Sequence, residues 1–360
     1  MRGYIATALL LQAVATNAVA QTSVQIFGSV DNGITYVNNY GGSSKVMLQD
    51  GMNKSNSLGF IGSEDLGGGK SAIFKLENGF SLNNGAMGQG GLMFGKQAWV
   101  GLADRDTGQI MLGRQYDYTV LLEQYLPCLN CGLYGVQNAD FDRVSGERLN
   151  NTVSVRSANF AGFTLSGMYA FGQNSGAFST NLGRAISAAV QYTNGPFTMG
   201  AVYTDINRAP IFAGLAGAPE VLGVAITSPA QTLYADNQRI FGIGATYRFA
   251  NARLAALYTN TRMTLGARSD TDQVLHVGID YSLRPNLNLM GKVSADRFAG
   301  SRWYSVNAGV DYLLSKRTDV YVDLGAQRAT GAGTVASIAL TAPSSTNTQF
   351  VSRVGIRHLF

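Results

Sequence analysis

The sequence carries little charge, few cysteines and prolines, and no long hydrophobic run after its first residues. Charged residues make up 14% of the 360 residues, and the chain has two cysteines and seven prolines. A soluble enzyme of this length usually carries more charge. A helical membrane protein would contain runs of about 18 or more apolar residues, and none follows the N-terminal segment. These scarcities argue against both classes.

The first twenty residues are typical of a secretory signal. Arg2 gives the positive start, 5–11 form a short apolar core, and Ala18-Val19-Ala20 is a small-residue cleavage site. The sequence therefore predicts a signal peptide at 1–20 and one mature domain at 21–360. Without Arg2 the basic residues exceed the acidic ones only modestly. The basic residues are also scattered, which argues against a nucleic-acid partner.

The sequence is rich in glycine, and its apolar and polar residues alternate. The chain contains 44 glycines. Apolar and polar residues alternate over about ten positions at a time, which is typical of transmembrane strands. In 24–37, for example, Ile26, Ile34 and Tyr36 share one face, and Asp31 and Thr35 share the other. Because side chains of a strand point to opposite faces in turn, we expect the first set to face lipid and the second to face a lumen.

A short pattern occurs four times: Gly, two residues, an aromatic or His, one residue, then Leu or Phe. The copies are 244–249, 278–283, 309–314 and 355–360. Each of the first three precedes a short polar turn and a returning alternating segment, so the repeat predicts an array of hairpins. The last strand must then pair with the first to avoid an open edge. We predict a closed all-β antiparallel barrel in an outer membrane, with an aromatic girdle at the short turns.

The alternation gives sixteen strands, an even number as bacterial barrels require. They are 24–37, 55–62, 70–80, 92–102, 109–114, 151–157, 162–171, 184–193, 197–205, 238–249, 253–262, 271–283, 286–296, 303–314, 318–327 and 349–360. No proline interrupts a strand, in keeping with its lack of a ladder donor. Short and long connections alternate, and the long ones include 38–54, 115–150 and 206–236. A soluble sandwich, the alternative, explains this alternation poorly.

With these residues in view, the chain resembles a general trimeric porin of Gram-negative bacteria, most closely the beta-proteobacterial branch. The resemblance rests on the order of five segments: 57–69 (SLGFIGSEDLGGG), 94–102 (FGKQAWVGL), 112–117 (LGRQYD), 149–153 (LNNTV) and Phe360. It implies a 16-stranded transmembrane barrel, a homotrimer, and passive diffusion of small hydrophilic solutes and ions, with no enzymatic activity and no cofactor. It also implies a long third outer loop folded into the lumen. Contacts with outer-membrane lipid and lipopolysaccharide follow, as does recognition of Phe360 by the assembly machinery.

The resemblance also implies a constriction, in which a basic wall faces an acidic inner loop. Lys75, Lys96 and Arg156 have inward parity, and Arg114 lies where the long loop begins. The loop offers Glu123, Asp140 and Asp142 opposite them. Rings of charge set selectivity in a pore, so we expect a weak preference for anions. For Asp140 and Asp142 a role as ordinary solvated lumen charges is an equal alternative. Ser57 replaces a basic residue that some relatives carry.

Two features of the same long loop leave alternatives open. Cys128 and Cys131 follow the spacing of a redox pair. In an oxidising compartment, however, a structural disulfide is the first interpretation, ahead of metal binding. A substrate-specific channel is the alternative function, and it would need an aromatic track along the lumen. The residues that could contribute to such a track are Phe27, Tyr116, Tyr118, Tyr125 and Tyr134.

Overall fold

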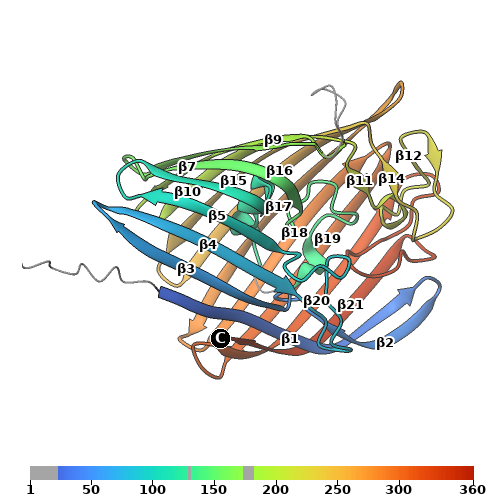
Figure 1. The fold of residues 1–360 in the computed structure, drawn as a ribbon. Coiled ribbons are helices and arrows are strands. Elements are labelled where there is room, and N and C mark those ends of the chain that lie inside the picture. Colours follow the sequence, from blue (N-terminus) through green and yellow to red (C-terminus); the bar gives the residue numbers. More distant parts are fainter. Residues whose placement is uncertain (1–22, 129–130, 173–181) are drawn as a thin grey trace, which may run out of the picture.

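The computed structural model describes residues 23–128, 131–172 and 182–360 (Figure 1). The predicted signal peptide, 1–20, lies outside the described residues. The described part of the chain forms one 17-stranded sheet and two small two-stranded sheets. The large sheet closes on itself because the last strand, β21, pairs antiparallel with the first, β1, from Ser29↔Leu359 to Val37↔Val351. This confirms the predicted closed antiparallel barrel.

Neighbouring strands of the barrel are consecutive in the chain. Their bounds are β1 Ser23–Tyr40, β2 Ser43–Asp50, β3 Ser57–Gly67, β4 Lys70–Gly79, β5 Gln97–Asp104, β6 Gly108–Tyr116, β7 Arg148–Ser157, β8 Phe163–Ala170, β9 Ala185–Asn194, β10 Phe197–Asn207, β15 Asn237–Phe249, β16 Ala252–Leu265, β17 Arg268–Arg284, β18 Leu287–Phe298, β19 Ser301–Leu313, β20 Thr318–Thr330 and β21 Thr348–Leu359. The described parts of the loops hold three 3₁₀ helices and four short strands: η1 Tyr118–Tyr125, η2 Leu133–Gly135, β11 Pro210–Ile211, η3 Ala213–Leu215, β12 Glu220–Val221, β13 Val224–Ala225 and β14 Leu233–Tyr234.

Seventeen strands occupy sixteen positions around the barrel, because β2 and β3 share one. The C-terminal half of β1 pairs with β2, from Asn32↔Asp50 to Tyr40↔Ser43. Its N-terminal half pairs with β3, from Ser23↔Ser63 to Ser29↔Ser57. The predicted outer loop 38–54 was therefore wrong over Ser43–Asp50. This segment continues the line of β3 toward the outside after a break at 51–56.

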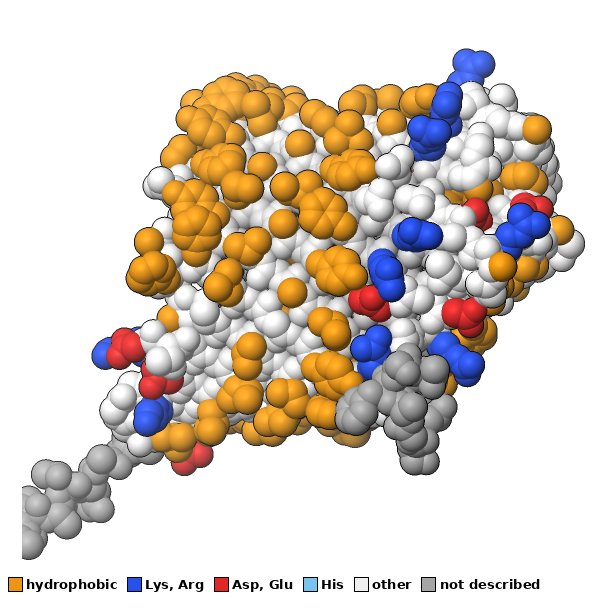
Figure 2. All heavy atoms as spheres, turned by 90° about the horizontal axis from the view of Figure 1, so that it is seen from above, with side chains coloured by type: hydrophobic (Ala, Val, Ile, Leu, Met, Phe, Trp, Pro, Cys, Tyr) orange, Lys and Arg blue, Asp and Glu red, His pale blue; other side chains and the backbone are white. Residues whose placement is uncertain are grey.

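The two faces of the wall follow the predicted alternation. On β1, Ile26, Ile34 and Tyr36 are exposed on the outside, whereas Asp31 and Thr35 are fully buried on the inside. The predicted girdle is also exposed at the short-turn end, at Tyr247, Phe249, Tyr281, Tyr312 and Phe360. Figure 2 shows the result as a wide apolar band, with Lys and Arg side chains beginning where the band ends on the side of the long loops.

Two outer connections are much shorter than predicted. The strands β16 and β17 meet at a two-residue turn, 266–267, and β18 and β19 meet at another, 299–300. Gly266 and Gly300 adopt positive φ there, which glycine does without steric cost. The strict alternation of short and long connections was therefore wrong here. The strands rise past the apolar band, so polar residues occupy their outer ends.

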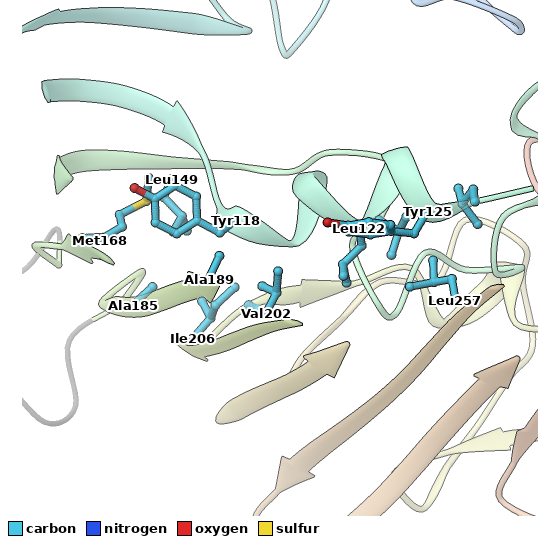
Figure 3. Close-up of a cluster of buried hydrophobic side chains, with 14 residues drawn as sticks. Tyr118, Leu122, Tyr125, Leu149, Met168, Ala185, Ala189, Val202, Ile206 and Leu257 are labelled. Atoms are coloured by element: carbon cyan, nitrogen blue, oxygen red, sulfur yellow. The ribbon is translucent and has the colours of Figure 1, made fainter. Parts of the chain in front are cut away.

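The third outer loop, 117–147, lies inside the barrel, as Figure 1 shows for its helical part. Its helix η1 inserts Leu122 and Tyr125 against the inner faces of β10 and β15 (Figure 3). Three wall glycines, Gly200, Gly242 and Gly244, make room for them: a Cβ added at any of the three would come within 2.5 Å of Leu122 or Tyr125. The barrel wall therefore carries a glycine trough, Gly200, Gly242 and Gly244, that seats the loop. Among the described residues, no helix is long and apolar enough to cross a membrane.

Candidate pore constriction

An ion-pair group lines the lumen on β4 and just before β5. Glu77, whose inward direction on β4 follows from parity, pairs with Lys75 Nζ at 3.0 Å and with Lys96 Nζ at 3.6 Å. Gln97 Nε2 donates to the same carboxylate at 3.1 Å. Lys75 also lies over the Phe27 ring, 4.9 Å from its centroid. Two ammonium groups thus share one carboxylate, which leaves the group with a net positive charge.

Lys96 is the most buried member of this group. Its side chain is 5% exposed, and its Nζ donates to the carbonyl oxygen of Ser55 at 3.3 Å. It precedes β5, so it lies in the loop and not in a wall strand. Burial lowers the pKa of Lys96 to about 8, Glu77 opposes this shift, and the nearby positive charges of Arg148 and Lys54 add to it. Lys96 can therefore lose its positive charge at a pH only slightly above neutral.

The negative partner from the loop is Glu123, which is exposed at the end of η1. Tyr116 lies within electrostatic range of Glu77, Glu123 and Arg148. Arg148 stacks over the Tyr116 ring at 4.6 Å and donates to its hydroxyl at 2.9 Å. Glu123 also lines a small cavity together with Lys292 and with Asn53, the chain neighbour of Lys54. We call Lys54, Lys75, Lys96, Arg148, Glu77 and Glu123 the constriction group.

The loop is tied to the barrel wall at several heights. Near the short-turn end, Arg253 donates to the carbonyl oxygen of Leu126 at 3.2 Å and pairs with Asp280. Higher up, Lys292 Nζ donates to the carbonyl oxygen of Gly135, and Tyr134 shares a 2.8 Å hydrogen bond with Thr35. These bonds, together with the glycine trough, hold the loop across the lumen, with contacts from β10 and β15 round to β1.

A buried ion pair closes the base of the loop. Arg143 Nε donates to Asp117 Oδ2 at 2.7 Å, and both side chains are nearly inaccessible to solvent. The Asp117 side chain also accepts from the backbone N–H of Thr119, so it caps η1 at the same time. This ion pair fixes the two ends of the roughly thirty-residue inner loop to each other.

Asp140 and Asp142, predicted at the constriction, take structural roles in the loop. Asp142 is 1% exposed and accepts from Thr259 Oγ1 on the far wall at 2.8 Å. Asp140 accepts from Ser145 Oγ at 2.6 Å. Burial raises the pKa of both carboxyl groups. The prediction placed them opposite the basic wall, but the loop turns them back toward β16 and toward its own backbone, which is a correction.

Arg114 and Arg156 also lie apart from the constriction group. Arg114 of β6 is the cross-strand partner of Ala98 on β5, and by parity its side chain faces outward. Its Nε donates to the carbonyl oxygen of Gly95 at 2.8 Å. Arg156 faces inward, but it lies at a different height in the barrel. The cross-strand pairs from β4 through β5 and β6 place Thr152 of β7 level with Lys75, and Arg156 lies four residues beyond Thr152. That separation is roughly 13 Å along a strand. Arg156 therefore lines the opening on the short-turn side.

The structure pairs Cys128 with Cys131, whose Cα atoms lie 5.2 Å apart, inside the usual range for disulfides. The backbone N–H of Cys128 donates to Asp280 Oδ1 at 2.8 Å, so the pair is attached to the same wall as Arg253. At the other end of the chain, Phe360 exchanges backbone hydrogen bonds with Gly28, at 3.0 and 3.1 Å.

Lys54, Glu77 and Arg148 were not among the predicted constriction residues. Glu77 carried a detectable signal, because it lies two residues from Lys75 and so on the same face of β4. Lys54 carried none, since it falls in the break between β2 and β3, which alternation does not describe. Arg148 begins β7, directly after the inner loop.

Residues 6–332 match the family of Gram-negative porins. An outer membrane porin protein of Bordetella pertussis is 28% identical over 72% of this chain and 70% of its own length. Outer membrane porin protein 32 of Delftia acidovorans is 28% identical over 98% of each chain.

Solved structures agree with this assignment. An anion-selective porin from Comamonas acidovorans superposes with a TM-score of 0.78 at 25% identity, over 94% of this chain and all of that one. The OmpF porin of Salmonella typhi shares the fold, with a TM-score of 0.62 at 18% identity over 94% of this chain and 97% of that one. The predicted family, fold and outer-membrane location are confirmed, and the protein is a channel and not an enzyme. This chain belongs to the Gram-negative porin family and forms an outer-membrane barrel for the passive diffusion of small solutes.

Proposed function

We propose that the channel prefers anions weakly and that the constriction group sets this preference. The observation that carries the proposal is the excess of positive charge: Lys54, Lys75, Lys96 and Arg148 share the space with the carboxylates of Glu77 and Glu123. A charged narrow passage concentrates the counter-ion and repels ions of its own sign. The resemblance to a porin described as anion-selective supports the same sign.

A substrate-specific channel receives less support. Such a channel would need exposed aromatic rings along the lumen. Tyr118, Tyr125 and Tyr134, three of the five candidates, are at least nine-tenths buried against the wall. Phe27 and Tyr116 are covered by Lys75 and Arg148. A continuous aromatic track is therefore not available from these residues.

The test is single-channel conductance of the purified, folded protein in a planar bilayer with a salt gradient. We expect a reversal potential of the sign that corresponds to anion preference. The double variant Lys75→Gln/Lys96→Gln should shift it toward cation preference, whereas Arg105→Gln, an exposed residue at a short turn, should leave it unchanged. Cation preference of the unmodified protein would contradict the proposal.

We also propose that the protein assembles as a homotrimer in contact with outer-membrane lipid and lipopolysaccharide. Export would remove 1–20, and the assembly machinery would recognise Phe360. These proposals follow from the family relationship. Mass measurement of the folded complex in detergent tests the trimer, and N-terminal sequencing of the mature protein tests cleavage after Ala20. A monomeric mass, or a mature chain that still begins at Met1, would contradict them.

We propose in addition that Cys128 and Cys131 form a structural disulfide in the inner loop. Support comes from their short Cα separation and from the exported location of the family. Mass spectrometry of the non-reduced protein, with alkylation under denaturing conditions, is the measurement. Two alkylated cysteines would overturn this proposal.

A further inference from the structure

We propose that the outer surface of β17–β21 binds a phosphorylated glycolipid of the outer leaflet, with its phosphates on an arginine triad and an acyl chain in the groove below. The arginine triad is Arg297, Arg302 and Arg328, on the adjacent strands β18, β19 and β20. This inference gives a location and a chemistry to the lipopolysaccharide contact proposed above. It does not depend on the ion preference of the pore.

The first observation is the spacing of the three arginines. Arg297 and Arg302 are direct cross-strand partners, and Arg328 is the partner of Tyr304, two residues further along β19. Like charges directly opposite each other destabilise a sheet. Their side chains are exposed, and among the described residues none of the three has a hydrogen bond or ion pair within the protein. An anion bound between these side chains would offset the repulsion.

The second observation is that no acidic residue neutralises this surface. The residues of β17–β21 that share the outward parity of Leu275, Val293, Val306, Leu324 and Val354 include no Asp or Glu. A second opposed pair, Arg239 and Arg262 on β15 and β16, behaves differently. Arg239 pairs with Asp205 at 3.1 Å, and Arg262 donates to Ser269 at 2.9 Å. The unpaired positive charge is thus concentrated on the arginine triad.

The third observation is the height of the arginine triad. Along β19 the outward residues run from Tyr312 at the short-turn end, through Val310 and Val306, to Tyr304 and then Arg302. Eight residues separate the two tyrosines, which corresponds to roughly 26 Å of strand. The tyrosines therefore bracket the apolar band, and Arg302 lies just outside it at the long-loop end. This is the depth of the phosphates in the outer leaflet.

The fourth observation is an apolar groove of about 690 Å³ directly below the arginines. Its floor is built of small side chains on four strands, which include Val277, Val293, Val306 and Ala326. Tyr304 and Phe350 line it as well, and Arg328 is itself a lining residue. An acyl chain in the groove would place a covalently linked phosphate next to the arginine triad. Arg guanidinium groups bind phosphate through paired, charge-assisted hydrogen bonds.

The experiment is native mass spectrometry of the folded, full-length mature protein in detergent, titrated with bisphosphorylated lipid A. The triple variant Arg297→Gln/Arg302→Gln/Arg328→Gln should lose about tenfold or more in affinity, because it removes the charge-assisted bonds to phosphate. The matched control, Arg105→Gln/Lys316→Gln/Arg317→Gln, removes equal charge at the short-turn end and should bind like the unmodified protein. Dephosphorylated lipid A should bind the unmodified protein as weakly as the triple variant binds the phosphorylated lipid.

The groove needs its own variant. Val306→Trp fills the groove and should weaken lipid A binding, whereas Val310→Trp, lower on the same strand, should not. Millimolar inorganic phosphate should fail to displace lipid A, because it has no acyl chain; complete displacement would mean that the arginines bind free phosphate instead. Equal lipid binding by the triple variant and the control, in protein that is folded by heat-modifiability, would overturn the proposal. Single-channel conductance should be unchanged in the triple variant, so failure of this proposal is distinguishable from failure of the pore assignment.

Discussion

Lys96 gives the channel a pH dependence that can be predicted from one side chain. Its pKa is lowered to about 8 by burial, and Glu77 opposes this shift. As pH rises through about 8, Lys96 loses its proton, and the constriction group loses one positive charge. We expect anion preference, measured as the reversal potential in a fixed salt gradient, to fall between pH 7 and pH 9.

The matched control is Lys96→Arg. Arginine keeps its charge over this range, so the reversal potential of this variant should stay flat where the unmodified protein changes. A change of equal size in both proteins would assign the titration to another group and contradict the prediction for Lys96.

Arg253 supports a second prediction about a single side chain. It is nearly buried, and it ties Gln124 and Leu126 of the loop to Asp280 of the wall. Removing one partner of a buried pair leaves the other charge uncompensated, at a cost of about 3–5 kcal/mol. We therefore expect Arg253→Met to lower the thermal midpoint of unfolding and to increase current fluctuations of the open channel. Arg248→Met, an exposed arginine at the nearby turn, is the control; a similar loss in both would assign the effect to charge alone.

Alternation in the sequence predicts which face a residue occupies but not its height or its loop geometry. Lys75 and Glu77 could be assigned because they lie within β4. Arg156 has the predicted direction, yet it lies near the short-turn end, since parity does not set the level across four staggered strands. Lys96 contacts the inward Glu77, but the predicted inward parity was wrong, because strict alternation with the outward Val100 and Leu102 would place Lys96 outside. The turn before β5 directs it inward. Asp140 and Asp142 lie in an irregular loop, where no period applies.

Among the larger elements, the position of η1 depends on the glycine trough as much as on the loop itself. A Cβ on Gly242 would come within 2.2 Å of Leu122, and one on Gly244 would come within 2.4 Å of Tyr125. The variant Gly242→Val/Gly244→Val should therefore push η1 toward the constriction group and lower single-channel conductance. Gly291→Ala, where the nearest atom is 3.9 Å away, should leave conductance unchanged. Equal conductance in all three folded proteins would show that the loop does not depend on the trough.

The same trough explains why part of the barrel could be predicted and part could not. The repeated motif Gly244-x-x-Tyr247 marked the hairpin and its girdle residue, and both were confirmed. Its glycine has a further role that no local pattern contains, because the partner, Tyr125, lies more than a hundred residues away. The segment Ser43–Asp50 escaped detection for a related reason. It is a strand only because β1 extends beyond β3 and offers it an unpaired edge.

For the barrel as a whole, closure depends on one close contact between the two ends of the chain. Gly28 on β1 exchanges backbone hydrogen bonds with Phe360, and a Cβ at Gly28 would come within 2.4 Å of both the Phe360 ring and the carbonyl oxygen of Ser57. The carbonyl oxygen is a backbone atom and cannot move aside without disturbing β3. Any larger residue at this position must therefore separate β1 from β21 or from β3.

Gly28→Val should consequently slow barrel closure more than a loss of side-chain contacts alone would. The measurement is refolding from urea into detergent, followed over time by heat-modifiable mobility on a gel. We expect slower formation of the compact band and a lower final yield for Gly28→Val than for Phe360→Ala, which removes the ring but keeps both backbone hydrogen bonds. If Phe360→Ala is slower than Gly28→Val, the aromatic ring, and not the approach of the strands at Gly28, limits closure. Because an unclosed sheet exposes the strand edges of β1 and β21, the slow variant should also aggregate at higher protein concentration.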